Sequence, residues 1–93
     1  MGDRMKREKI LSIAEGLING DRADIYGSAF DNFTRIGILW GVMLGTEPVA
    51  PEVVGLMLVQ LKAARLVATP AHDDSWIDLA GYAALAGEIA TAA

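Results

Sequence analysis

Apolar residues recur along this chain at intervals of three and four, which is the spacing of one face of a helix. No stretch alternates apolar and polar residues as a half-buried strand would. The pattern predicts four helices, over about 5–19, 28–45, 51–67 and 74–90. Gly20 and Gly45 suit the ends of the first two helices, and Pro51 suits the first position of the third. The expected fold is therefore all-α, a single compact four-helix domain spanning residues 1–93.

The predicted helix over 51–67 is apolar around almost its whole circumference, so we expect it to be the most enclosed element. Lys62 and Arg65 nevertheless lie three positions apart on one of its faces. A buried cation is costly unless an acid or an anionic ligand meets it. The acids available for this role are Asp31, Asp74 and Asp78. The alternative is a solvated stripe in which bases near the helix end follow the helix dipole.

Composition adds an expectation about assembly. Hydrophobic residues make up 53% of the 93 residues, more than a lone small domain readily encloses. Small residues gather at Gly37-x-x-x-Gly41 and in the Ala/Gly-rich segment 80–87. Small side chains let helices approach closely. We therefore expect a homo-oligomer built through these Gly/Ala-rich helices.

The net charge of −4 argues against general nucleic-acid binding, which needs a basic surface. Half of the basic residues crowd the N-terminus, at Arg4, Lys6, Arg7 and Lys9. This cluster is either a solvated helix start with a frayed basic tail over about 1–6 or an arm that contacts RNA.

Cysteine is absent, which excludes disulfides and thiolate metal sites. The longest apolar runs are far shorter than the roughly 20 residues that cross a bilayer. The N-terminus lacks the apolar core of a signal peptide. We therefore expect a cytoplasmic protein that does not bind membranes.

The polar residues concentrate in two segments, 22–35 and 72–85, each at the start of a predicted helix. In the first, Tyr26-Gly27-Ser28 forms a tight turn into a helix N-terminus, where free backbone N–H groups can receive a phosphate. Arg22 stands just upstream, and the pattern from Ser28 to Asp31 is typical of a capping box. Two such helix starts suggest one shared site.

In the second segment, Asp74 and Asp78 are four positions apart, so both carboxylates face the same way on a helix. They can share a magnesium ion or hold Lys62 and Arg65. Tyr82 follows Asp78 one turn later on the same side.

Helix capping offers an ordinary explanation of the same residues. Ser75-x-x-Asp78 has the pattern of a second capping box, with Trp76 as a core anchor. A lone histidine such as His72 is more often a loop or cap residue than a ligand or a base.

Several of these motifs recur in the same order in a family of short phage and prophage proteins of unassigned function, which this chain resembles from about residue 22 to 89. The shared motifs are Tyr26-Gly27, Asp31-Asn32-Phe33, Lys62-x-x-Arg65, Asp74-Ser75-Trp76-x-Asp78 and Gly81-Tyr82.

The all-helical design and the acid-x-x-x-acid opening resemble, more distantly, the all-α nucleotide pyrophosphohydrolases of the MazG type. These are magnesium enzymes that split nucleoside triphosphates, so the resemblance implies Asp31, Asp74 and Asp78 as metal ligands. Such enzymes carry Glu-Glu-x-x-Glu on one helix and Glu-x-x-Asp on another, and this chain has fewer acids at the matching positions. We therefore favour ligand binding over hydrolysis.

Three function hypotheses follow. The first is a phage-type protein that binds, and so sequesters, a nucleotide or other phosphorylated small molecule without turnover in the host cytoplasm, with basic side chains on phosphate and aromatic rings on a base. The second is a magnesium-dependent MazG-like pyrophosphohydrolase. The third is a helical interaction module whose polar cluster is a structural ion-pair network. The candidate ligand-binding residues are Arg22, Tyr26, Ser28, Asn32, Lys62, Arg65, His72, Trp76 and Tyr82.

Overall fold

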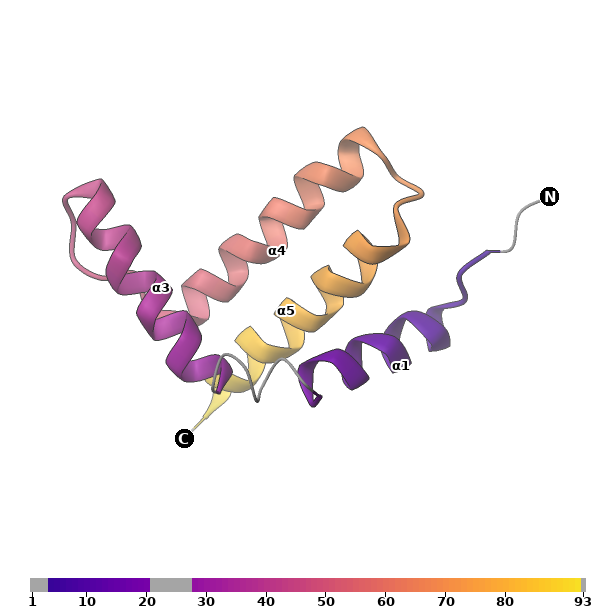
Figure 1. The fold of residues 1–93 in the computed structure, drawn as a ribbon, viewed down its shortest axis with the longest axis horizontal. Helices are drawn as coiled ribbons and strands as arrows, with labels where there is room; N and C mark the ends of the chain where they lie inside the picture. Colours follow the sequence, from indigo (N-terminus) through magenta and orange to yellow (C-terminus); the bar gives the residue numbers. More distant parts are fainter. Residues whose placement is uncertain (1–3, 21–27, 93) are drawn as a thin grey trace.

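The computed structural model describes residues 4–20 and 28–92, and every regular element in these ranges is a helix. The helices are α1 (Arg7–Ile18), α3 (Ala29–Leu44), α4 (Pro51–Ala68) and α5 (Asp73–Thr91), shown in Figure 1. Each boundary lies within two residues of the prediction. The all-α architecture is confirmed for the described part of the chain.

Local signals explain three of the helix ends. The Ser28 hydroxyl accepts a hydrogen bond from the Asp31 N–H at 3.1 Å, which caps the N-terminus of α3. Gly45 ends α3 in the left-handed region at φ 70°, where a glycine carries no steric penalty. Pro51 occupies the first turn of α4, as predicted.

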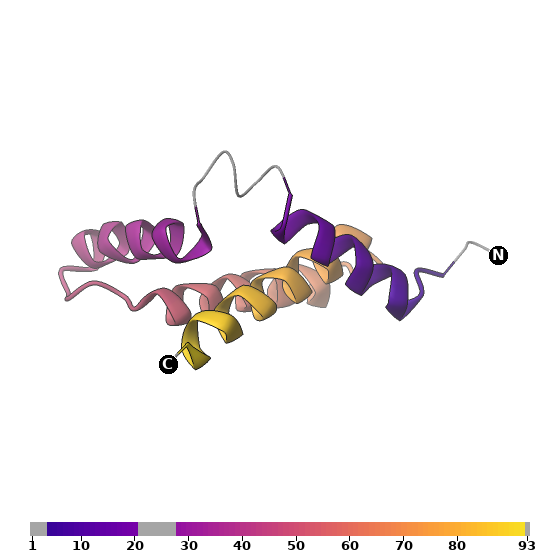
Figure 2. The ribbon, with the colours of Figure 1, turned by 90° about the horizontal axis from the view of Figure 1, so that it is seen from below.

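Helices α4 and α5 form an antiparallel pair that is the centre of the molecule (Figure 1). Helix α1 packs on α5, and α3 packs mainly on α4 (Figures 1 and 2). The α4–α5 contact is close because Gly55 lies against Ala86, and a Cβ at position 55 would be 2.6 Å from the Ala86 Cβ. On the other side of α5, Gly81 faces the Ile18 side chain of α1.

The Gly37-x-x-x-Gly41 face of α3 is occupied by the chain's own loop before α4. A Cβ on Gly37 would meet the Val49 carbonyl oxygen, and one on Gly41 would lie 2.9 Å from the Glu47 carbonyl oxygen. The Val49 N–H donates to the Gly37 carbonyl at 3.0 Å. The expectation that these two glycines face another subunit is therefore wrong, because the returning loop takes up that space.

The prediction that the third helix would be the most enclosed element is also wrong within the described residues. Because α4 has neighbours mainly at α3 and α5, its outward side remains exposed and includes Val53, Leu56 and Leu61. The buried apolar residues are few and mostly small: Ala14, Phe33, Val54, Leu66, Ile77 and Ala86.

The shape is more extended than a compact domain of this length. The radius of gyration is 14.4 Å, against about 12 Å for a compact chain of similar length. Figure 1 shows the cause, since α3 diverges from the α4–α5 pair and leaves an open angle. Within the described ranges, no helix combines the length and apolar character that crossing a bilayer requires.

Candidate functional site

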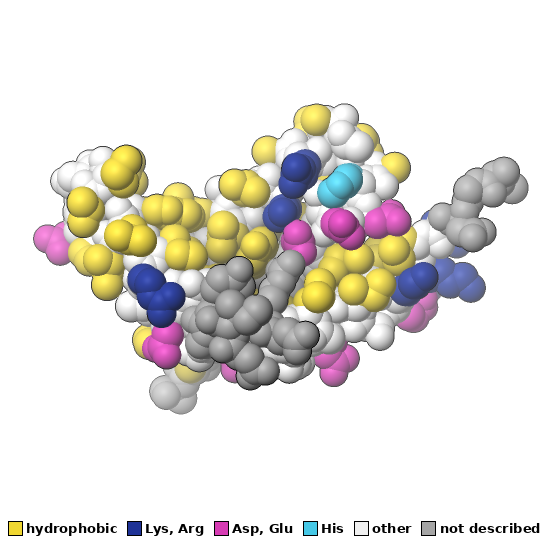
Figure 3. Space-filling model, in the orientation of Figure 1, with side chains coloured by type: hydrophobic (Ala, Val, Ile, Leu, Met, Phe, Trp, Pro, Cys, Tyr) yellow, Lys and Arg dark blue, Asp and Glu magenta, His cyan; other side chains and the backbone are white. Residues whose placement is uncertain are grey.

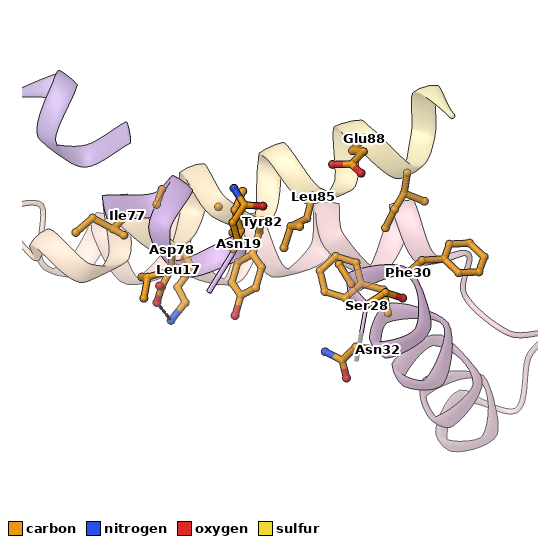
Figure 4. A pocket seen from close by; sticks show the side chains of 17 residues that line it. Leu17, Asn19, Ser28, Phe30, Asn32, Ile77, Asp78, Tyr82, Leu85 and Glu88 are labelled. Atoms are coloured by element: carbon orange, nitrogen blue, oxygen red, sulfur yellow. Dashed lines mark ion pairs between the residues drawn. The ribbon is translucent and has the colours of Figure 1, made fainter. Parts of the chain in front are cut away.

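A cleft of about 670 Å³ lies where α1, the first turn of α3, and α5 approach one another, with one side chain contributed by α4 (Figure 4). Five of the predicted site residues line it: Ser28, Asn32, Lys62, Asp78 and Tyr82. They come from three segments that are far apart in the sequence. The structure brings these five residues to one cleft, and their roles in ligand binding stay predictions.

Lys62 and Asp78 form an ion pair across the α4–α5 contact. The Lys62 Nζ lies 3.1 Å from the Asp78 Oδ2, and the two side chains are only 14% and 19% exposed. The predicted acid opposite Lys62 is therefore Asp78. Arg65 differs, because it is exposed and forms no ion pair with another described residue. The expectation that both cations are buried is wrong for Arg65, since α5 covers only the side of α4 that carries Lys62.

The N-terminus of α3 opens onto the cleft through Ser28, Ala29 and Phe30. The Ser28 side chain and carbonyl already receive the N–H groups of Asp31 and Asn32. The N–H groups of Ala29 and Phe30 have no partner among the described residues, as expected for the first turn of a helix. These two donors, with the positive end of the helix dipole, can receive an anion.

The remaining wall is aromatic and apolar with a few polar groups. Phe33 and Tyr82 face each other with ring centroids 6.4 Å apart and planes at 53°. Tyr82 and Asn32 contribute a hydroxyl and an amide to the lining of the cleft (Figure 4). Leu17 and Leu85 add apolar surface. Apolar walls with a few convergent polar groups are typical of small-molecule sites.

His72 and Trp76 lie elsewhere and serve the start of α5. The His72 Nδ1 accepts the Ser75 N–H at 3.3 Å and lies 2.8 Å from the buried Ser75 hydroxyl, so His72 is the helix cap. The prediction of a cap role for His72 is confirmed. The predicted capping box beginning at Ser75 is wrong, because Asp78 pairs with Lys62 and the helix begins two residues before Ser75.

Trp76 is 44% exposed, so it is not the core anchor that the sequence suggested. Its indole Nε1 donates to the Pro70 carbonyl at 2.8 Å, which ties the α4–α5 loop to α5. Neither His72 nor Trp76 lines the cleft.

Two of the three predicted metal ligands, Asp31 and Asp74, are exposed and do not line the cleft. No group of three His, Cys, Asp or Glu side chains suited to a metal ion occurs in residues 4–20 and 28–92. Arg22 and Tyr26 lie outside the described residues, so their predicted roles stay predictions.

The structure adds cleft residues that the sequence did not indicate, including Leu17, Asn19, Phe30, Leu85 and Glu88. Lys62 is the single basic residue among the described residues of the lining. No local sequence signal marks these positions, because they meet only through the angle at which α1 and α3 approach α5.

The sequence matches, over residues 9–90, the family described as "Domain of unknown function (DUF6378)". It is 45% identical over 74 residues to the Gene 55 protein of Mycobacterium phage L5, covering 80% of this chain and 47% of that protein. It is 41% identical over 76 residues to the Gene 55 protein of Mycobacterium phage D29, covering 82% of this chain and 50% of that protein. The chain thus spans about half the length of these curated relatives.

No solved structure matches the chain. The predicted resemblance to a phage family of unassigned function is confirmed by these matches. The more distant resemblance to MazG-type enzymes stays a prediction.

Proposed function

We propose that this chain, which belongs to the DUF6378 family of unknown function, binds a nucleotide or another phosphorylated small molecule in the cleft without turning it over. The observation that carries the proposal is that Ser28, Lys62 and Tyr82 all line one cavity. Its volume of about 670 Å³ lies within the roughly 300–1,000 Å³ typical of ligand sites.

The N-terminus of α3 is the proposed phosphate site. The N–H groups of Ala29 and Phe30 supply two donors there, and the helix dipole favours an anion. Lys62 supplies a cation in the same cleft, because its ammonium has three N–H donors and the Asp78 carboxylate oxygen accepts from one of them. A phosphate can therefore bind Lys62 while the ion pair persists.

The charge of the lining favours a ligand with few phosphates. Asp78 and Glu88 contribute two carboxylates to the described lining, against the single ammonium of Lys62. A triphosphate would bring several more negative charges next to these two carboxylates. The resulting repulsion grows as water is excluded from the cleft. We therefore expect nucleoside monophosphates or cyclic nucleotides to bind more tightly than triphosphates.

The aromatic wall is the proposed base site. Tyr82 offers a ring face and a hydroxyl, and the Phe33 ring packs beside it as a tilted aromatic pair. The Asn32 amide carries both a donor and an acceptor, which suits the edge of a base. By holding such a ligand in the host cytoplasm, a phage-type protein of this kind would sequester it.

The test is a titration calorimetry panel with nucleoside mono- and triphosphates, cyclic nucleotides and ADP-ribose-type nucleotides in the presence of magnesium, with products separated afterwards by ion-exchange chromatography. Binding without product is the expected result. Lys62→Gln should weaken binding about tenfold or more, because a charge-assisted hydrogen bond contributes roughly 1.5–3 kcal/mol. Arg65→Gln is the matched control, an exposed cation three positions along the same helix, and it should change affinity less than about twofold.

Two results would contradict the proposal. If no member of the panel binds while circular dichroism shows an intact fold, the cleft is not a nucleotide site. If pyrophosphate is released and Asp78→Asn abolishes the release, the protein is a magnesium-dependent hydrolase instead.

We also propose that the chain associates with copies of itself. The support is the amount of apolar surface that one copy leaves in water, since fourteen large hydrophobic residues are exposed. In the described residues, the largest side chains that are less than 2% exposed are those of Val54 and Ser75. Enclosure of a full core would thus need a further partner.

A further inference from the structure

Helices α3 and α4 share a broad apolar surface that nothing in the described chain covers. Every exposed position between 36 and 44 on α3 is apolar. On α4, Gln60 is the single polar side chain among the exposed positions between 53 and 64. Figure 3 shows hydrophobic side chains over α3 and continuing onto the adjoining part of α4. We call this surface the α3–α4 face, formed by Ile38, Leu39, Val42, Met43, Val53, Leu56, Met57 and Leu61.

We infer that the α3–α4 face binds the same face of a second copy of this chain, as a two-fold symmetric interface. This inference rests on the self-association proposed above and specifies the surface. Gly37 and Gly41 on α3 are covered by the chain's own loop, so they cannot contact a second copy.

The area of the α3–α4 face matches what a stable dimer needs. Its eight side chains are between 38% and 84% exposed and together present on the order of 900 Å², against about 800 Å² per partner in a standard-size interface. The small exposed residues of α5, such as Ala83 and Ala84, offer much less area each. Interfaces of obligate homodimers resemble a protein core divided in two.

Charge also favours a second copy. The chain carries a net charge of −4, so most pairs of surfaces would bring like charges together. The α3–α4 face contains no charged residue, and it can therefore meet itself without repulsion. A nucleic acid or a strongly charged protein would find no complementary charge there.

The open angle between α3 and α4 fits the same partner (Figure 1). Helix α3 packs mainly on α4 and diverges from the rest, so the core is incomplete in one copy. Because every copy leaves this surface exposed, a partner that covers it must be present at the same concentration as the chain. A second copy meets that condition by definition.

The first experiment is sedimentation velocity across about 1–100 µM, compared with the monomer mass of 9.9 kDa. Leu56→Lys places a charge in the α3–α4 face and should weaken association at least a hundredfold. Leu11→Lys is the matched control, because Leu11 is 63% exposed on α1 and Leu56 is 55% exposed on α4. Leu11→Lys should leave the mass unchanged.

The second experiment does not depend on the folding of a destabilised variant. The chain has no cysteine, so Gln60→Cys introduces a single thiol at an exposed polar position within the face. A short bismaleimide should link two copies of Gln60→Cys, whereas Glu15→Cys on α1 should give little product.

The outcomes separate the two claims. A monomeric wild type at all concentrations overturns both the self-association and the interface. An associated wild type with an equally associated Leu56→Lys, or equal cross-linking from Glu15→Cys, overturns the α3–α4 face alone. In that case the Ala-rich side of α5 is the surface to examine.

Discussion

The Lys62–Asp78 ion pair should be the most stabilising polar contact between α4 and α5. Its atoms are 3.1 Å apart, and both side chains are more than four-fifths enclosed. Replacing Lys62 with Met keeps the aliphatic stem and removes the charge, which leaves the Asp78 carboxylate without a partner. Breaking a fully buried pair costs about 3–5 kcal/mol, whereas an exposed pair contributes about 0–1 kcal/mol.

Because the pair retains some contact with water, we expect Lys62→Met to lower the free energy of unfolding by about 2–3 kcal/mol. For a domain of this size, that corresponds to a fall in Tm of roughly 10–20 °C. The double variant Lys62→Met with Asp78→Leu should lose less than the sum of the single variants, since no orphaned charge remains.

The assay is urea unfolding at one fixed protein concentration, followed by tryptophan fluorescence and far-ultraviolet circular dichroism. A fixed concentration is needed because self-association adds to apparent stability. Arg65→Met is the control and should change the unfolding free energy by less than about 0.5 kcal/mol. If Lys62→Met is no more destabilising than Arg65→Met, the ion pair is not the enclosed contact argued above.

Three further variants test the local packing and the caps by the same unfolding assay. Gly37→Ala should lower stability by more than about 2 kcal/mol, because its Cβ would meet the Val49 carbonyl oxygen; Gly87→Ala, with open space around it, should instead raise stability by about 0.5–1 kcal/mol. A neutral or stabilising Gly37→Ala would contradict the loop packing. Ser28→Ala removes the cap of α3 and should cost about 1 kcal/mol, and no loss would mean that the cap does not form in solution. His72→Ala should cost about 1–3 kcal/mol by removing the acceptor at the start of α5, and substantial rescue by His72→Asn would show that the acceptor is the cause.

The positions of the helices were predictable because their signals are local. Ser28, Gly45 and Pro51 mark helix ends through hydrogen bonds and backbone geometry within a few residues. The sequence predicts the start of α5 one residue late. Both Ser75 and His72 can cap a helix, and serine is the commoner cap of the two residue types. Which of the two residues caps α5 depends on the turn after α4, where the His72 N–H donates to the Thr69 carbonyl.

Burial was predicted less well, because it depends on which sides of a helix acquire neighbours. Lys62 and Arg65 are three positions apart on α4, which is a rotation of about 60° around the axis. That difference suffices for α5 to cover Lys62 and leave Arg65 in water. The apolar pattern of α4 likewise predicted enclosure, and the structure leaves its outward side exposed because no described helix covers it.

The candidate site was predicted in part. Lys62 and Asp78 followed from the cost of burying a charge, which is a general constraint on any fold. The sequence does not indicate Asn19 and Glu88, because their place in the cleft depends on the angles at which α1 packs on α5 and α3 packs on α4. Such angles are set by tertiary contacts rather than by sequence spacing.

The central claim is that a phosphorylated ligand binds in the cleft with its phosphate at the start of α3. Two-dimensional NMR of the ¹⁵N-labelled protein, titrated with the tightest nucleotide of the panel, tests this most directly. The account predicts saturable shifts of the Ala29 and Phe30 amide signals, with smaller shifts near Lys62 and Tyr82. Unshifted Ala29 and Phe30 signals, or saturable shifts confined to the outward side of α4, would contradict it.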